Sequence, residues 1–462
     1  MKSTESAAVA AQSSATQDTP AIARRGGSIK SALVGTVFAD LAVLAIGVAT
    51  GPVAARLLQP EGRGAVAAVT FWPILLASAG LFSLNEATTY RIGARPERYE
   101  TTTASAFRLS LLFSLLTISL GLLLIPRLLG PDRASLVGIA LLYLVFFVPT
   151  NATALTLAST DHGQLRFARY NLQRVAVPAI YLAGLLILWA TDRVTVGAVV
   201  AASCLGTITL AVYRIGSQIR TVFARATWEE TAALLKLALS FHPASLLMFL
   251  ATQADQFMVL TLWNNETLGK YVVALTISSS SLSVVCGGFQ RVLFPHIANR
   301  TAEANPERLM ARGIRMASLA MVLSSTVLAL NIGWLLPLVF GEPFRSSVGP
   351  ARVLLFAYIL VALRNLMIQL LRGMGEGKAG AIASALAASV FIPTAYLLGR
   401  SMGLYGVAIA LGLANILAVA YLGRYIARKW NLRFDDLCGL NSATLRELWT
   451  YVTALRARAG LA

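Results

Sequence analysis

Charged residues are scarce in this sequence. Asp, Glu, Lys and Arg make up 13% of its 462 residues, whereas soluble domains carry roughly 25%. Hydrophobic residues make up 56%, and the mean hydropathy is +0.68. These values exclude an ordinary soluble globular protein and favour one that lies in a lipid bilayer.

Cysteine and histidine are also rare, with three of each. They are scattered along the chain, so neither a disulfide framework nor a metal site is predicted. The phosphate-binding pattern G-x-x-x-x-G-K-[ST] is missing too, because Ala379 follows Gly377-Lys378. We therefore expect no metal, no cofactor and no ATP hydrolysis.

Long apolar runs take the place of the missing charges. Each run has about the 20 residues that cross a ~30 Å hydrocarbon core as an α-helix. The connections between the runs are short, which leaves no room for a soluble domain. The runs are centred near residues 42, 76, 114, 146, 181, 204, 250, 281, 325, 360, 388 and 413.

The two halves of the chain repeat one pattern. Asp40 recurs as Asp255 and Pro178 as Pro393, both 215 residues later, and matching glycines follow in the same order at offsets between 207 and 214. Such a parallel repeat predicts two lobes related by an axis along the membrane normal. We expect an all-α polytopic membrane protein with about 12 transmembrane helices in two six-helix lobes around a central cleft.

This repeat sets the expected domains. The segment before the first apolar run and the segment after the last one are both polar, and we expect both to be cytoplasmic tails. Residues 442–455, in the second tail, form an amphipathic stretch expected to lie at the membrane interface. The predicted units are a disordered tail (1–27), an N-lobe (28–216), a linker (217–232), a C-lobe (233–427) and a basic tail (428–462).

The net charge of +18 raises the question of nucleic acid, which the placement of the charges answers. With a cytoplasmic N-terminus, roughly 29 Lys and Arg fall in inner segments and roughly 9 in outer ones, the bias expected of a membrane protein. We therefore expect a multi-pass protein of the plasma (inner) membrane with both termini cytoplasmic. Anionic membrane lipids are the expected partners of its basic surface, and nucleic acid is not.

Three segments resemble one family. Residues 54–64, AARLLQPEGRG, resemble the aRlLgPeGxG loop of polysaccharide transporters, the Wzx-type flippases, although Gln59 stands where that family usually has Gly. Residues 268–274, LGKYVVA, follow Asp255 and resemble the family's lGxYxxA signature, with Pro295 closing it. Residues 370–378 are similar to its lxGxGr turn. The resemblance extends from about residue 28 to 425 and belongs to the multidrug, oligosaccharidyl-lipid and polysaccharide exporter superfamily.

The resemblance implies a transporter rather than an enzyme. Its cargo would be a polyprenyl-diphosphate-linked oligosaccharide or polysaccharide repeat unit, moved by alternating access from the inner to the outer leaflet for cell-surface polysaccharide biosynthesis. Coupling to a proton or sodium gradient, and contact with other polysaccharide-assembly proteins, would fit this role. The related lipid II flippases usually carry fourteen helices, two more than this sequence supports.

Two other functions stay open at this point. An ion-coupled multidrug exporter of the same superfamily would have the same helices, although without the loop at residues 54–64. A membrane glycan polymerase or ligase meets the same lipid-linked sugars, but such enzymes typically carry a long outer loop, and the outer loops here are short.

Such a cargo calls for cations at its diphosphate and a polar path for its sugars. Arg364 lies well inside a predicted helix, where a charge is costly and therefore a functional candidate. For the arginines near the inner interface, anchoring at the membrane surface is the alternative role. The diphosphate candidates are Arg364, Arg291, Arg108, Arg166, Arg169 and Arg174, and the sugar-path candidates are Asn85, Asn151, Asn171, Gln253 and Gln290.

Acidic residues inside the predicted helices are candidates for ion coupling. Asp40 and Asp255 occupy repeat-related positions, one on each lobe, and the alternative for each is a structural hydrogen bond or ion pair within its lobe. Glu86 is the third candidate. It lies at nearly the same place in the repeat as Arg291, so we hypothesise that the two side chains bridge the lobes when the inner mouth of the cleft is closed. The alternative is that the two side chains do not bridge and that each extends to the inner membrane interface.

Overall fold

The structure is a computed structural model that describes residues 29–298, 305–374 and 376–432. Its regular elements in these ranges are helices, as predicted. The predicted tail 1–27, most of the tail 428–462 and its amphipathic stretch at residues 442–455 lie outside the described residues.

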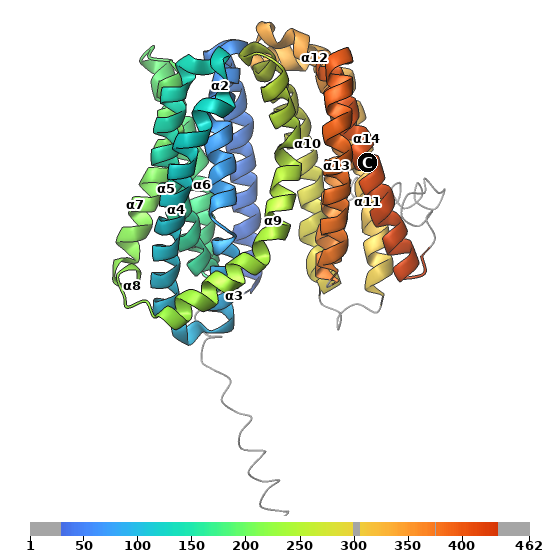
Figure 1. The fold of residues 1–462 in the computed structure, drawn as a ribbon. Coiled ribbons are helices and arrows are strands. Elements are labelled where there is room, and N and C mark those ends of the chain that lie inside the picture. Colours follow the sequence, from blue (N-terminus) through green and yellow to red (C-terminus); the bar gives the residue numbers. More distant parts are fainter. Residues whose placement is uncertain (1–28, 299–304, 375, 433–462) are drawn as a thin grey trace, which may run out of the picture.

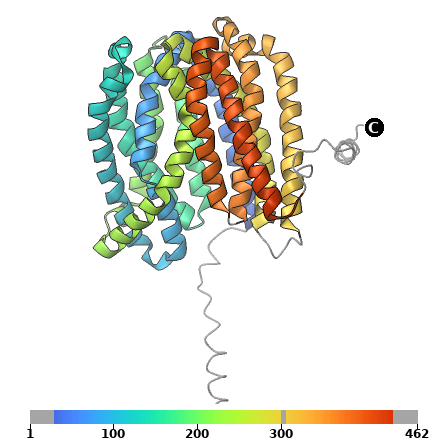
Figure 2. The ribbon, with the colours of Figure 1, turned by 45° about the vertical axis from the view of Figure 1, so that its right-hand side comes forward.

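The helices form two groups that lie side by side (Figures 1 and 2). The N-terminal group contains α2 (Ile29–Gly80), α3 (Leu84–Ala94), η2 (Pro96–Arg98), α4 (Tyr99–Leu129), η3 (Pro131–Arg133), α5 (Ala134–Gly163), α6 (Phe167–Ala190), α7 (Val196–Ser217) and α8 (Ile219–Val222). The C-terminal group contains α9 (Trp228–Leu262), α10 (Asn265–Ala298), α11 (Pro306–Phe340), η4 (Glu342–Ser347), α12 (Val348–Gly373), α13 (Gly377–Met402) and α14 (Leu404–Lys429). The domain boundaries drawn from the sequence remain predictions.

Eleven helical stretches of the described residues are long and apolar enough to cross a membrane. The first of them contains two predicted helices, because α2 is kinked at Gln59 (φ 57°, ψ 177°). Pro60 explains the place of the kink, since a proline disfavours the helical conformation of the residue before it. Figure 1 shows the two parts of α2 running beside each other. Each of the twelve predicted centres falls in a helix, which confirms the all-α membrane fold.

The molecule has two distinct ends. We call the end that carries α3 and α8, at the bottom of Figure 1, the α3 end. The opposite end carries Gln59, η3 and η4, and we call it the Gln59 end. The predicted second helix breaks near the α3 end, where Phe82 and Ser83 adopt positive φ values of 50° and 56° and separate α2 from α3.

Hydrophobic packing differs between the two ends. At the Gln59 end one core joins both groups, with Val66 and Val69 of α2 in the same cluster as Leu268 and Val272 of α10. At the α3 end the described residues form separate clusters, one drawn from α10 to α14 and another from the N-terminal group and the start of α9. Because buried apolar area holds helices together, the groups are joined most firmly at the Gln59 end.

Helix α9 belongs to both groups. Its first turns lie on α3 and α4, where Glu230 accepts two hydrogen bonds from Arg91 (2.7 and 2.8 Å) and one from Thr102 (2.8 Å). Its later turns pack against α13 and α14. Glu230 lies before the membrane-spanning part of α9, and the hydrogen bonds from Arg91 lower the pKa of its carboxyl group from 4.5 to about 2. The ion pair therefore fastens the start of α9 to the N-terminal group.

We predict that Glu230→Gln lowers the thermal stability of the purified protein, by about 2 kcal/mol, because it leaves Arg91 without its carboxylate. Since the pKa of Glu230 is lower in the folded protein, this contribution is complete above about pH 4.5 and is lost as the pH falls toward 2. Thermal unfolding in detergent at several pH values measures it. The control is Glu229→Gln, because Glu229 is 76% exposed whereas Glu230 is fully buried; equal effects of the two changes would contradict the role of Glu230.

Candidate functional site

Asp255 is a buried carboxyl group with neutral partners. It lies on α9, and its Oδ2 accepts hydrogen bonds from the hydroxyl groups of Tyr271 on α10 (2.8 Å) and Tyr358 on α12 (3.3 Å). The backbone N–H of Gln256 donates to its Oδ1 (2.8 Å). No cationic side chain of the described residues lies within ion-pair distance. A buried carboxylate is costly unless it binds a proton or a cation, so the site is suited to taking up one of these.

Asp40, the repeat-related residue, has a different environment. Its carboxylate pairs with Arg174, so α2 is tied to α6. Asn171 lies one turn away and donates to the Thr36 hydroxyl (3.0 Å), which adds a second link between the same helices. The structural alternative raised for Asp40, an ion pair within its own group, is therefore what the structure contains. Asp255 has no such ion pair with any side chain that the structure describes.

The ends of α5 and α7 carry a buried ion pair, which no pattern in the sequence indicated. Arg214 donates to Asp161, to the side-chain oxygen of Gln173 (2.9 Å) and to the carbonyl of Arg169 (2.8 Å). Asp161 and Arg214 are at most 2% exposed. Arg166 approaches the same Asp161 at 3.9 Å. This network joins α5, α6 and α7 at the α3 end.

Three of the four diphosphate candidates of the N-terminal group have side-chain partners within the protein. Arg166 faces Asp161, Arg174 pairs with Asp40, and Arg108 donates to the carbonyl of Ala224 (3.0 Å). Arg169 contacts Arg214 through its backbone carbonyl, while its own side chain is exposed. The contacts of these side chains are therefore structural ones within the N-terminal group.

Arg364, on α12, is the buried candidate. Its side chain is 3% exposed, and no carboxylate of the described residues lies within ion-pair distance. Its Nε has no hydrogen-bond partner there, and its Nη2 reaches only the side-chain oxygen of the adjacent Asn365, at 3.5 Å. A buried guanidinium normally needs strong acceptors. Arg364 therefore has unused donors in the interior of the C-terminal group.

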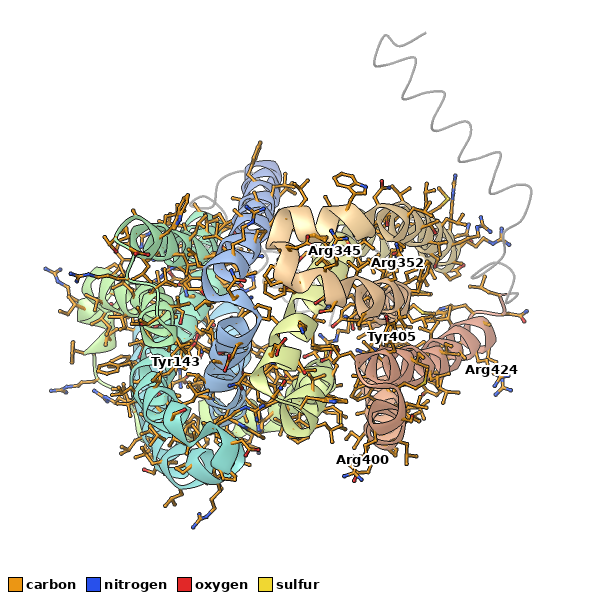
Figure 3. All side chains as sticks on the ribbon, turned by 90° about the horizontal axis from the view of Figure 1, so that it is seen from above. Tyr143, Arg345, Arg352, Arg400, Tyr405 and Arg424 are labelled. Atoms are coloured by element: carbon orange, nitrogen blue, oxygen red, sulfur yellow. The ribbon has the colours of Figure 1, made fainter. Side chains whose placement is uncertain are left out.

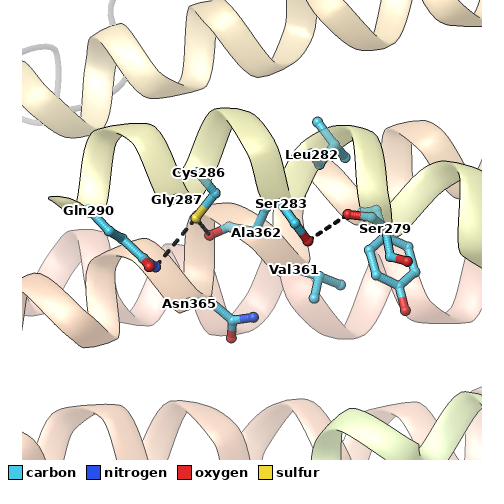
Figure 4. Close-up of a pocket in the computed structure, with 10 residues that line it drawn as sticks. Ser279, Leu282, Ser283, Cys286, Gly287, Gln290, Val361, Ala362 and Asn365 are labelled. Atoms are coloured by element: carbon cyan, nitrogen blue, oxygen red, sulfur yellow. Dashed lines mark hydrogen bonds between the residues drawn. The ribbon is translucent and has the colours of Figure 1, made fainter. Parts of the chain in front are cut away.

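A pocket of about 200 Å³ lies between α10 and α12 (Figure 4). Asn365 and Tyr358 of α12 line it; Asn365 accepts the hydrogen bond from Arg364 and Tyr358 donates to Asp255, whereas Arg364 and Asp255 themselves are not lining residues. Gln290, a sugar-path candidate, also lines it and donates to the Cys286 sulfur at 3.4 Å. The other lining residues are Ser279, Leu282, Ser283, Gly287, Val361 and Ala362. The wall thus presents hydroxyl and amide groups next to apolar side chains, and no formal charge.

The remaining candidates are spread over both groups. Glu86 is exposed on α3 and accepts a hydrogen bond from Ser245 of α9 (2.9 Å), and the side chain of Arg291 lies outside the described part of the structure. Their bridge therefore stays a hypothesis. Asn85, Asn151 and Gln253 are partly buried on α3, α5 and α9, respectively, away from the pocket lining.

The sequence did not predict that Tyr271 and Tyr358 donate to Asp255, or that the amide of Asn365 contacts Arg364. Tyr271 could have been found, because it is the tyrosine of the family-like segment LGKYVVA. Tyr358 is 103 residues from Asp255, and its contact depends on how α12 is rotated against α9. No pattern along the chain reports that rotation.

Two groups of long apolar helices define the class as a polytopic membrane protein. The chain belongs to the polysaccharide biosynthesis protein family, whose match covers residues 53–349. Family and fold together confirm the predicted transporter of the multidrug, oligosaccharidyl-lipid and polysaccharide exporter superfamily, rather than an enzyme.

Solved structures show the same fold. The chain is similar to the lipid II flippase MurJ in an inward closed conformation, with 14% identity, a TM-score of 0.72 and coverage of 90% of this chain and 92% of that one. It is also similar to an inward-facing multidrug resistance MATE family transporter, with 16% identity, a TM-score of 0.64 and coverage of 86% and 98%. A transporter of the same superfamily from Pyrococcus furiosus is similar as well, with 16% identity, a TM-score of 0.61 and coverage of 88% of this chain and 96% of that one. Among curated protein sequences, none matches the chain.

We predict opposite effects of removing the two buried arginines. Arg214→Met leaves the buried Asp161 unpaired and should cost about 3–5 kcal/mol of stability, whereas Arg364→Met removes an unpaired buried charge and should leave stability unchanged or raise it. Thermal unfolding of both variants, purified without cargo, makes the comparison. A loss for Arg364→Met as large as that for Arg214→Met would show that Arg364 has a structural role.

Proposed function

We propose that the protein is an alternating-access flippase that moves a polyprenyl-diphosphate-linked oligosaccharide or polysaccharide repeat unit from the inner to the outer leaflet of the plasma membrane. The family is named for polysaccharide biosynthesis, and we propose that the cargo serves the synthesis of cell-surface polysaccharide. The fold it shares with a lipid II flippase supports movement of a lipid-linked glycan.

The observation that carries the proposal is the unpaired, buried Arg364. A guanidinium offers donors in a planar fork that suits two phosphate oxygens at once. An arginine kept in a membrane interior without a carboxylate lowers stability, which makes a functional role the default explanation. A diphosphate would supply the acceptors that the described residues do not.

The neighbouring pocket supplies the second half of the proposal. Hydroxyl and amide side chains such as Ser283, Gln290 and Asn365 suit the hydroxyl groups of a sugar, because each can donate or accept a hydrogen bond. The polyprenyl tail needs no pocket, since it can remain in the bilayer. In this proposal Arg364 holds the diphosphate and the pocket takes the first sugar.

The orientation follows from the charges. Arg91, Arg98, Arg108, Arg166 and Arg169 lie at the α3 end, which would be cytoplasmic by the positive-inside rule. Both chain termini would then be cytoplasmic. The separate cores at the α3 end fit a state that admits cargo from the inner leaflet.

We predict that depleting the protein causes its host to accumulate one completed polyprenyl-diphosphate glycan that an impermeant sugar-labelling reagent cannot reach. Mass spectrometry of extracted lipids identifies that cargo. Complementation with Arg364→Gln should leave the accumulation in place, whereas Arg372→Gln should relieve it, because Arg372 is an exposed arginine on the same helix. An unchanged lipid pool after depletion would contradict the proposal and favour a drug exporter.

For coupling, we propose that Asp255 rather than Asp40 takes the proton or sodium ion. Asp255→Asn keeps acceptors for the two tyrosines but removes the titratable group, so flipping in vesicles should lose its dependence on an imposed gradient. Asp40→Asn should retain that dependence, because Asp40 is already paired with Arg174. Gradient dependence that survives in Asp255→Asn and is lost in Asp40→Asn would reverse the assignment.

A further inference from the structure

The two groups make close backbone contact at the Gln59 end. A Cβ on Gly269 of α10 would lie 1.9 Å from the carbonyl oxygen of Pro60, and a Cβ on Gly64 of α2 would lie 1.7 Å from the carbonyl oxygen of Asn265. Only glycine allows such an approach. The second part of α2 and the first turn of α10 are therefore in direct backbone contact.

Arg56 links the groups beside this contact. It lies on α2 within residues 54–64, the segment that resembles the flippase loop. Arg56 has no role in the proposed cargo site. Its Nε donates to the carbonyl of Val339 (3.0 Å) and its Nη2 donates to the carbonyl of Leu338, both in the last turn of α11. The last carbonyls of a helix have no partner within the helix and carry its negative partial charge. An arginine of one group thus caps a helix of the other.

Arg133, in η3, repeats this arrangement on a second helix. Its Nη1 donates to the carbonyl of Leu260 (3.0 Å) and its Nη2 to that of Trp263 (2.7 Å), at the end of α9. Its Nε donates to the side-chain oxygen of Asn265 (2.7 Å), at the start of α10. Two arginines of the N-terminal group therefore hold the ends of two helices of the C-terminal group.

We propose that Arg56 and Arg133 form an arginine gate that closes the Gln59 end and sets how often the transporter opens there. They are positioning residues of the transport cycle and act through the ends of α11 and α9. The inference rests on the proposed alternating-access function, because release of cargo in the outer leaflet requires these five hydrogen bonds to break. At the α3 end the two groups have separate cores, and the start of α9 connects them.

The test measures distances between pairs of spin labels in the absence of cargo. The sample is the full-length protein in lipid nanodiscs, and the three cysteines of the protein are replaced by serine. Spin labels at Asp192 and Ser401, both exposed, report the Gln59 end, and labels at the exposed Glu97 and Lys378 report the α3 end. In Arg56→Gln with Arg133→Gln we expect the population with the longer Asp192–Ser401 distance to rise about tenfold for each arginine removed. The Glu97–Lys378 distance should shorten in step.

Two controls separate the gate from general damage. Arg345→Gln removes another arginine at the same end (Figure 3), whose partner Glu342 lies in the same short helix, and it should change neither distance. Arg56→Lys with Arg133→Lys keeps the positive charge and an N–H donor group at each position, so it should restore part of the closed population. If the double variant does not fold, each single glutamine variant is measured alone.

Distance distributions of the glutamine variants that match those of the parent would overturn the gate. So would a longer distance at the Gln59 end with no change at the α3 end, since that indicates fraying of helix ends rather than alternation. Because no cargo is present, either result leaves the proposed cargo unaffected, and a negative depletion assay leaves the gate unaffected.

Discussion

The cost of placing a charge in hydrocarbon governs this structure. In the N-terminal group Asp161 has Arg214, Asp40 has Arg174, and Arg91 pairs with Glu230 at the start of α9. In the C-terminal group Asp255 has only neutral donors among the described residues, and Arg364 has no carboxylate there. Partnered charges fix helices to one another, whereas charges without a partner are suited to ligands that arrive and leave.

This difference assigns separate roles to the two groups. The N-terminal group is held together by ion pairs at the α3 end and supplies the arginines that reach across at the Gln59 end. The C-terminal group contains the pocket between α10 and α12, and Tyr358 both lines this pocket and donates a hydrogen bond to Asp255. That shared tyrosine places the proposed coupling site next to the proposed cargo site, so that occupation of one can change the shape of the other.

The approximate number of helices and the fold could be predicted from the sequence. An apolar run of about 20 residues predicts each membrane helix, and the repeat of the first half in the second predicts the two groups. The proline after Gln59 likewise marks where α2 reverses. Contacts between helices could not be predicted, since they depend on rotation and tilt. The pairing of Arg174 with Asp40, 134 residues apart, and the approach of Tyr358 to Asp255 are of this kind. Arg364 was singled out correctly as a buried cation, because burial of one residue follows from its neighbours in sequence.

The most direct test of the account is binding of a polyprenyl diphosphate to the purified protein, measured by native mass spectrometry. The parent protein and Arg372→Gln should retain the lipid diphosphate, whereas Arg364→Gln should lose it, and none of the three should retain the polyprenol that lacks phosphate. Equal retention of the diphosphate by Arg364→Gln and the parent would contradict the claim that the unpaired arginine is the phosphate site.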